Sequence, residues 1–285
     1  MKHLVNIILL FCCHQAFGQY YYSDIIATNE TNEQMKSWRA AGVAMVTASG
    51  TDNRGSKASG FSETYQVLQN GSLVKKTTIN DFTKTVNNSR YNTDGFILSS
   101  ADSLTPIQNA ITYTYDNQGR IINIRNIVKD SSNDFNQAET HIWQYDESGS
   151  PTTMWRIIEN EGAMAGTDSM EIKFIKDAAG NITEERSYKH GRETNFLYYY
   201  YNDANQMSDI VRYNTKLKKL IPEIMFEYDA NGKVIQKITT ISDRTIGYLL
   251  WRYIFDGKGL KTKEALFDNK KQLTGKINYE YQFNK

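Results

Sequence analysis

The sequence predicts an all-β protein: an extended antiparallel meander of about eight hairpin repeats that form a twisted or spiralling sheet, preceded by a short N-terminal helix. Three observations indicate this class. The 285 residues include 19 tyrosines and only 3 prolines, and aromatic and β-branched side chains suit a pleated, half-buried surface. Apolar and polar residues alternate in many segments, as in strands with one buried face. An Asp-x-x-Gly motif returns at regular spacing, and such motifs close hairpins.

The first eighteen residues are typical of a secretory signal peptide. Lys2 provides a basic start, Leu4–Cys13 is mostly apolar, and Ala16-Phe17-Gly18 offers small residues for cleavage before Gln19. The expected location is therefore outside the cytoplasm: the periplasm, the outer surface or the extracellular medium. A lipid-modified cysteine at position 12 or 13 is the alternative, although the residues before them are poor matches for that signal.

We divide the chain into a signal peptide (1–18), an N-terminal segment with a short helix and a flexible loop (19–62), and a β-hairpin repeat domain (63–285). Both cysteines lie in the signal peptide, so the mature chain depends on packing and hydrogen bonds instead of disulfides. Lys2 is the only charged residue in 1–18, so cleavage leaves no formal net charge. A nucleic-acid partner is therefore not expected, because it would require an excess of basic residues. No cofactor is expected either. No apolar run in the mature chain is long enough for a transmembrane helix.

The N-terminal segment is expected to hold one helix and one loop. Thr31-Asn32-Glu33-Gln34 resembles a capping box, which predicts a helix that begins there and ends near Gly42, with Met35 and Trp38 on one side. The following stretch, 50–60, is polar and rich in glycine, so we expect a mobile loop or linker.

The repeat is the strongest feature of the sequence. A short motif built on tyrosine, aspartate and glycine, not all of them present in every copy, recurs at intervals of 24 to 31 residues. Such regular repetition indicates a structure built from similar units. The turn residues of the clear copies are Asp116 and Gly119, Asp146 and Gly149, Asp177 and Gly180, Asp229 and Gly232, and Asp256 and Gly259. Asp203–Gln206 is a sixth copy that lacks the glycine, and two weaker copies precede the six, Leu68–Gly71 and Asn92–Gly95.

The motif predicts hairpin tips along one edge of the sheet. The aspartate accepts hydrogen bonds from the backbone that follows it, and the glycine takes the left-handed conformation that closes the hairpin with a bulge. Gln206 stands where glycine is expected, which should cost about 1 to 2 kcal/mol if the left-handed geometry is kept. The turns of the opposite edge vary in sequence.

These tandem Tyr-Asp units, with glycine three residues after the aspartate, resemble the YD repeats of the Rhs family of bacterial cell-surface proteins, over roughly residues 63–283. The resemblance implies a spiral of antiparallel strands, which in large members encloses a C-terminal toxin. This chain ends with the repeats and lacks the proline-rich motif that precedes such toxins. Toxin delivery is therefore not expected, and about eight hairpins are expected to be too few for a closed shell.

The favoured function is a non-catalytic binding or scaffold module of the bacterial envelope, with a glycan or an envelope protein as possible partner. Two long turns of the variable edge, 129–138 and 159–168, are the first choice for a binding site. Their candidate contacts are Asp130, Asp134, Glu159 and Asp168. The aromatic run Tyr198–Tyr201 must place two rings on each face of its strand, and exposed rings bind sugars or partner proteins.

Two alternatives remain open. A glycan-processing enzyme would need two convergent carboxylates, which adjacent Glu184 and Glu185 cannot supply because strand neighbours point to opposite faces. His141 is expected to be a packed histidine, and the turn role of the aspartates makes a metal site unnecessary. An outer-membrane β-barrel would need lipid-facing apolar rows, which Lys75 and Lys76, on opposite faces of one strand, interrupt.

Overall fold

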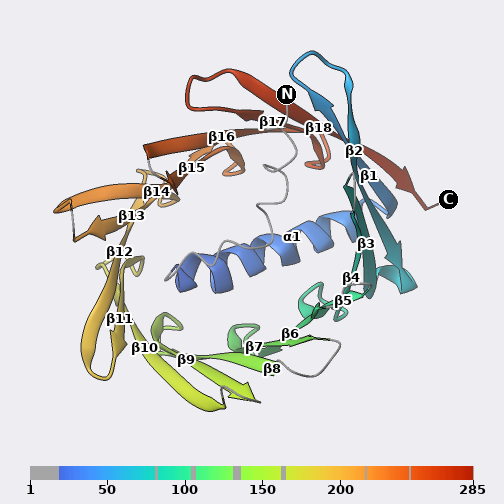
Figure 1. Ribbon diagram of the computed structural model, residues 1–285. Coiled ribbons are helices and arrows are strands. Elements are labelled where there is room, and N and C mark those ends of the chain that lie inside the picture. The colour runs from blue at the N-terminus through green and yellow to red at the C-terminus, as the bar shows by residue number, and fades with distance from the viewer. Residues whose placement is uncertain are drawn as a thin grey trace.

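The protein is a closed antiparallel β-barrel with a helix inside its ring of strands (Figure 1). The computed structural model describes residues 19–80, 83–103, 107–130, 136–161, 165–215, 217–243 and 245–284, with side chains described for all of these except 57–60 and 242–246. A single sheet of eighteen strands runs through the described residues, and each strand pairs with its neighbours in the chain.

The strands are short to medium in length and alternate in direction. In chain order they are β1 Val43–Asp52, β2 Lys57–Leu68, β3 Leu73–Asn80, β4 Thr83–Tyr91, β5 Ile97–Ser103, β6 Ile107–Tyr115, β7 Ile121–Asp130, β8 Asn136–Tyr145, β9 Pro151–Glu161, β10 Gly166–Lys176, β11 Ile182–Lys189, β12 Arg192–Tyr201, β13 Met207–Asn214, β14 Lys219–Tyr228, β15 Val234–Asp243, β16 Thr245–Phe255, β17 Lys261–Phe267 and β18 Leu273–Phe283.

The predicted open meander is wrong, because the first and last strands pair and close the ring. β1 and β18 form an antiparallel ladder in which Val46 faces Tyr281 and Ala48 faces Tyr279. The expectation that the hairpins would be too few for a closed shell is wrong for the same reason. Of the alternatives drawn from the sequence, the outer-membrane barrel is the one that shares this closed architecture.

The Asp-x-x-Gly motifs are hairpin tips on one rim of the barrel, as predicted. In the tip between β6 and β7, Asp116 Oδ1 accepts hydrogen bonds from the backbone N–H groups of Gln118 and Arg120, each at 2.9 Å. Gly119 has a φ of +78°, the left-handed conformation that closes the turn. The glycines at 149, 180, 232 and 259 repeat it, with φ between +76° and +91°.

A tyrosine at the end of several strands ties its hairpin to the hairpin before it, although the units at Asp177 and Asp256 have Lys176 and Phe255 in this place. Tyr145 points into the barrel, and its hydroxyl donates a hydrogen bond to the carbonyl oxygen of Ile121, the first residue of β7, at 2.6 Å. The same bond recurs around the ring between Tyr115 and Ile97, Tyr201 and Ile182, Tyr228 and Met207, and Tyr281 and Lys261. The ladder of β8 and β9 shifts register beside Tyr145, as it does at a β-bulge. The repeated tyrosine is therefore a clasp between neighbouring units.

The tip between β12 and β13 differs from the prediction by one residue. Asn202 takes the role of the aspartate, since its side-chain oxygen accepts hydrogen bonds from the backbone of Ala204 and Gln206 at 3.0 Å. Asn205, with a φ of +61°, takes the role of the glycine. The strain expected at Gln206 is thus avoided, because asparagine tolerates the left-handed conformation better than most residues.

The N-terminal segment forms a plug, residues 19–40, that lies inside the barrel (Figure 1). A π-helical turn, Tyr21–Ile26, leads directly into α1, Ala27–Ala40. The predicted capping box is wrong, because Thr31 lies inside the helix and its hydroxyl donates to the carbonyl oxygen of Ala27. Met35 and Trp38 are buried against the barrel wall, as their spacing on the helix suggested.

The plug and the wall share two apolar clusters. The larger one gathers Tyr20 of the plug with Trp143, Met154 and Ile210 of the wall, and the smaller one gathers Met35 and Trp38 with Val46. The inward residues of each strand alternate with outward ones, which follows from the two-residue period of a strand. The predicted loop at 50–60 is wrong, because these residues belong to the hairpin of β1 and β2, with its turn at 53–56.

Candidate functional site

The barrel wall opens between β12 and β13 at the rim opposite the Asp-x-x-Gly tips. The ladder between these strands ends at the pair of Leu197 and Arg212. The residues that would form the next pairs, 193–196 and 213–215, line a cleft of about 720 Å³ together with Arg186, Tyr198 and Arg212. We call this feature the wall cleft. Because the strands separate here, its lining comes from both faces of β12.

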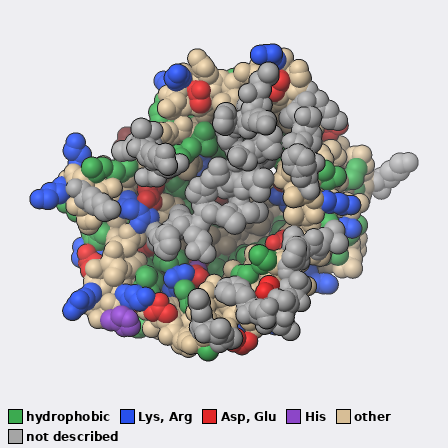
Figure 2. Space-filling model, viewed as in Figure 1, with side chains coloured by type: hydrophobic (Ala, Val, Ile, Leu, Met, Phe, Trp, Pro, Cys, Tyr) green, Lys and Arg blue, Asp and Glu red, His purple; other side chains and the backbone are tan. Residues whose placement is uncertain are grey.

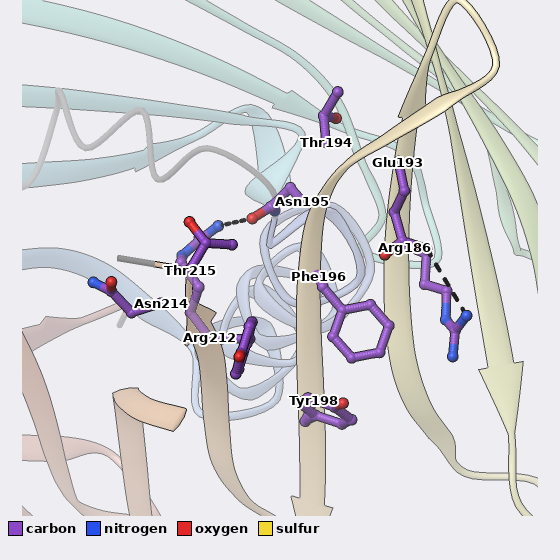
Figure 3. A pocket seen from close by; sticks show the side chains of 10 residues that line it. Arg186, Glu193, Thr194, Asn195, Phe196, Tyr198, Arg212, Asn214 and Thr215 are labelled. Atoms are coloured by element: carbon purple, nitrogen blue, oxygen red, sulfur yellow. Dashed lines mark hydrogen bonds and ion pairs between the residues drawn. The ribbon is translucent and has the colours of Figure 1, made fainter. Parts of the chain in front are cut away.

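Aromatic rings line the outer side of the wall cleft. Phe196 and Tyr198 point outward from β12, with ring centroids 4.5 Å apart in an edge-to-face arrangement. The guanidinium of Arg186 lies over Phe196, 4.6 Å from the ring centroid, and is also paired with Glu184 at 2.6 Å. Figure 3 shows the two rings on the opposite side of β12 from Asn195. The outer side thus offers flat apolar faces beside a cation that already has a partner.

Polar groups line the inner side of the wall cleft. Arg212 binds Asn195 Oδ1 across the opening (Figure 3) and forms an ion pair with Glu223 of β14. Glu223 also accepts a hydrogen bond from the side chain of Gln19, so the cleft is connected to the start of the plug. Asn195 Nδ2 is buried and has no hydrogen-bond partner among the described residues. A buried donor without a partner costs about 1 to 3 kcal/mol, so an acceptor atom placed here would be stabilised.

A buried glutamate of the wall caps the start of the plug. Glu185 of β11 is fully buried and accepts hydrogen bonds from the backbone N–H groups of Tyr20 and Tyr21, at 3.1 and 2.9 Å, and from the hydroxyl of Tyr199, at 2.7 Å. The first N–H groups of a helix lack partners in the helix, and a carboxylate satisfies them. Burial nevertheless outweighs these bonds and raises the pKa of Glu185 to about 7.

A second polar contact binds the plug at Asp24, a few residues after the contact with Glu185. His141 of β8 binds Asp24 of the plug through Nδ1, at 2.6 Å, and Glu139 through Nε2, at 2.8 Å. Burial disfavours the imidazolium, but the charges and hydrogen bonds of Asp24 and Glu139 outweigh it and raise the pKa of His141 to about 9. Arg156 also binds Glu139, at 2.7 Å. The predicted packed histidine is therefore a charged link between wall and plug.

The structure places two of the four predicted contacts, Glu159 and Asp168, on opposite faces of the wall. Glu159 points outward from β9 and pairs with Arg125 at 3.2 Å, whereas Asp168 points inward from β10 and binds Lys189 at 2.7 Å. Asp130 is the last residue of β7, paired with Ile107, and Asp134 lies outside the described residues. Glu159 and Asp168 therefore do not share a surface.

The sequence signalled one part of the wall cleft and missed the other. The prediction that Tyr198–Tyr201 divides its rings between two faces is confirmed, since Tyr199 is buried and Tyr200 is 46% exposed. Asn195, Arg212 and Glu223 carried no signal, because they lie on three strands and meet only where the pairing of β12 and β13 ends. Glu184 and Glu185 point to opposite faces, as predicted, and among the described residues that line the cleft Glu193 is the only one with a carboxylate.

The chain resembles several solved structures at low identity. No protein-family model and no curated protein matches it. A porin-like protein from Bacteroides uniformis is 10% identical, with a TM-score of 0.41 over 84% of this chain and 98% of that chain. A porin-like protein from Bacteroides vulgatus is 11% identical, with a TM-score of 0.34 over 74% and 97% of the two chains. The Photorhabdus luminescens Tc holotoxin pore is 12% identical, with a TM-score of 0.32 over 81% of this chain and 15% of that chain. With TM-scores below 0.5, nothing about the function of this chain follows from these likenesses.

Proposed function

We propose that the protein is an exported, non-catalytic binding protein of the bacterial envelope, and that its wall cleft binds a neutral glycan. The observation that carries this proposal is the combination of two outward aromatic rings, Phe196 and Tyr198, with a buried amide donor of Asn195 that lacks a partner. Aromatic rings pack against the C–H faces of sugar rings, and side-chain amides bind sugar hydroxyl groups.

The charges of the wall cleft favour a neutral ligand over an acidic one. Arg186 is paired with Glu184, and Arg212 is paired with Glu223. An acidic group of a ligand would have to displace these carboxylates. Glu193, which also lines the cleft, would repel it.

The lining of the wall cleft also supports a binding role over a catalytic one. Hydrolysis of a glycosidic bond uses two carboxyl groups on either side of the bond, and Glu193 is the only carboxylate among the lining residues. The predicted contacts Asp130, Asp134, Glu159 and Asp168 stay a separate prediction, to be tested by alanine substitution and binding to whole envelopes.

Binding assays with two matched variants test the proposal. The mature chain is applied to an array of neutral and acidic glycans, and the affinity for the best neutral glycan is then measured by calorimetry. Phe196→Ala with Tyr198→Ala should lower the affinity at least tenfold, as loss of a central aromatic contact does in other interfaces. Trp155→Ala, which removes a ring 38% exposed on the outer face of β9, should not. Binding of no neutral glycan, or equal loss in both variants, contradicts the proposal.

The closed ring favours an outer-membrane barrel as the second candidate. The outer surface argues against this candidate, because a membrane barrel presents an apolar band to lipid and the outward side chains of this barrel include charged ones. The outward side chains of β7 are Asn123, Arg125, Ile127 and Lys129, and those of β11 are Glu184, Arg186 and Tyr188. A lysine or arginine that faces the middle of a bilayer costs about 2 to 4 kcal/mol. None of the helices in the described part of the chain is long and apolar enough to cross a membrane.

Expression without residues 1–18 separates the two candidates. A water-exposed barrel should be folded and monodisperse in buffer without detergent, with the circular dichroism of a β-protein and a cooperative thermal transition. A chain that aggregates in buffer and refolds only in detergent micelles would favour the membrane barrel.

A further inference from the structure

The turn between β13 and β14 exposes apolar side chains that the fold does not use. Leu217 is 54% exposed, Leu220 is 48% exposed and Tyr213, which faces Leu220 across the ladder, is 42% exposed. We call Tyr213, Leu217 and Leu220, with Lys218 and Lys219, the leucine tip. Residues at turns are usually polar, because they lie in water. Three exposed apolar residues at one tip therefore point to a partner surface.

The geometry of the turn holds the leucine tip in place. The backbone N–H of Leu217 donates a hydrogen bond to Asn214 Oδ1, at 2.9 Å, and Lys218 has a φ of +50°. The side-chain bond and the left-handed residue fix the direction of the chain at the tip. Leu217 and Lys218 thus have a defined backbone conformation among the described residues of the turn.

Positive charge accompanies the apolar side chains of the leucine tip. Lys218 and Lys219 are both exposed, and neither forms an ion pair within the described part of the chain. Figure 1 shows the hairpin of β13 and β14 extending from the outline of the barrel, and at the same edge Figure 2 shows Lys or Arg side chains next to hydrophobic ones. Free cations beside exposed leucines complement a surface that is anionic outside and apolar beneath.

We propose that the leucine tip docks on an anionic lipid surface. Leu217 and Leu220 would enter the boundary between head groups and acyl chains, and the two lysines would remain among the acidic head groups. Tyr213, an apolar ring with a polar end, suits the same interface. A patch of this size gives weak, reversible binding, since stable anchoring needs more than one such signal. Tyr213 also lines the wall cleft, but the substitutions described below leave it, Phe196 and Tyr198 unchanged, so the two proposals are tested separately.

Vesicle flotation tests the docking surface. The mature protein is mixed with vesicles of phosphatidylcholine alone or of phosphatidylcholine with phosphatidylglycerol, and the fraction that floats is measured. Binding is expected only to the vesicles with phosphatidylglycerol, and it should weaken as salt is added. Lys218→Ser with Lys219→Ser should lower the partition coefficient by about 25-fold, at about fivefold for each lysine. Leu217→Ser with Leu220→Ser should lower it by a comparable factor.

A second pair of lysines provides the matched control. Lys270 and Lys271 lie in the turn between β17 and β18, on the same rim, without exposed leucines beside them. Lys270→Ser with Lys271→Ser removes the same charge and should leave flotation within twofold of the unaltered protein. Thermal transitions of all variants show whether they are folded. No binding to either vesicle, binding regardless of lipid charge, or equal loss in the control variant would overturn the proposal.

Discussion

At the scale of single residues, Glu185 makes the stability of the barrel depend on pH. Its pKa is raised to about 7, mainly by burial, so the folded state favours the neutral carboxyl. The stabilisation from this group is therefore complete below the ordinary pKa of a glutamate and is lost as the pH rises through about 7. The difference corresponds to roughly 3 kcal/mol at full ionisation. Asp24, also close by, raises the pKa further.

We expect Glu185→Gln to remove this part of the pH dependence. Glutamine keeps the shape of the neutral carboxyl but cannot ionise. The melting temperature of the unaltered protein should fall between pH 5 and pH 8, and that of the variant should fall less. His141, whose pKa is raised to about 9, loses stabilisation between its ordinary pKa and 9, so both proteins should still weaken at the upper end. Parallel curves for the two proteins from pH 5 to pH 7 would contradict the assignment.

The tyrosine clasp is also a single-residue feature. Tyr145→Phe removes the hydroxyl that binds the carbonyl oxygen of Ile121 at 2.6 Å, and should lower the free energy of unfolding by about 1 kcal/mol. Tyr200→Phe is the control, because Tyr200 points outward and is 46% exposed. Urea denaturation measures both. A loss of equal size in the two variants would show that the inward hydroxyl has no special part in stability.

At the scale of elements, the hairpin tips allow a test of backbone strain without steric clash. Gly180 has a φ of +91°, and nothing lies within 4 Å of where a Cβ would stand. Gly180→Ala should therefore lower stability by about 1 to 2 kcal/mol through conformation alone. Gly257, in the tip between β16 and β17, has equal space and no left-handed conformation. Gly257→Ala should be neutral or stabilise by about 0.4 to 1 kcal/mol. Chemical denaturation of both variants checks the contrast.

These elements show what local sequence can predict. Turn geometry depends on a few neighbouring residues, so the tips at Gly119, Gly149 and Gly232 could be located from the sequence. The helix start could not, because the capping pattern at Thr31 competes with contacts that only the barrel provides. The same holds for the tip at Asn202, where a neighbouring aspartate, Asp203, suggested a register one residue too late.

The candidate site was harder to predict, because it forms from distant parts of the chain. His141 meets Asp24 across 117 residues, and Gln19 meets Glu223 across 204. The wall cleft exists because the ladder between β12 and β13 ends early. No residue type in the sequence indicates where a ladder ends. Alternation did predict that the rings of Tyr198–Tyr201 divide between the two faces of β12, and that was the only part of the cleft with a local signal.

At the scale of the whole molecule, ring closure changes how stability is shared. An open array of hairpins would depend on contacts between successive units, and loss of a terminal unit would shorten it. In the closed ring, β18 pairs with both β17 and β1, and Tyr281 packs against the cluster that holds Met35 and Trp38. Removal of the last hairpin would open the ring, expose two strand edges and uncover the end of the plug.

A truncation after Leu260 tests this consequence. Without β17 and β18, we expect loss of the cooperative thermal transition and rapid digestion by trypsin throughout the chain, since the plug and the first strands lose their partners together. An open meander predicts the opposite outcome: a shorter protein that melts cooperatively at a slightly lower temperature, with protection lost only near β16. A substitution in β1, the other strand of the closing ladder between β1 and β18, is the matched experiment. Ala48→Asp places a charge at a fully buried position opposite Tyr279, so it should destabilise the intact chain by several kcal/mol, whereas Thr47→Asp, on the outward face of the same strand, should not.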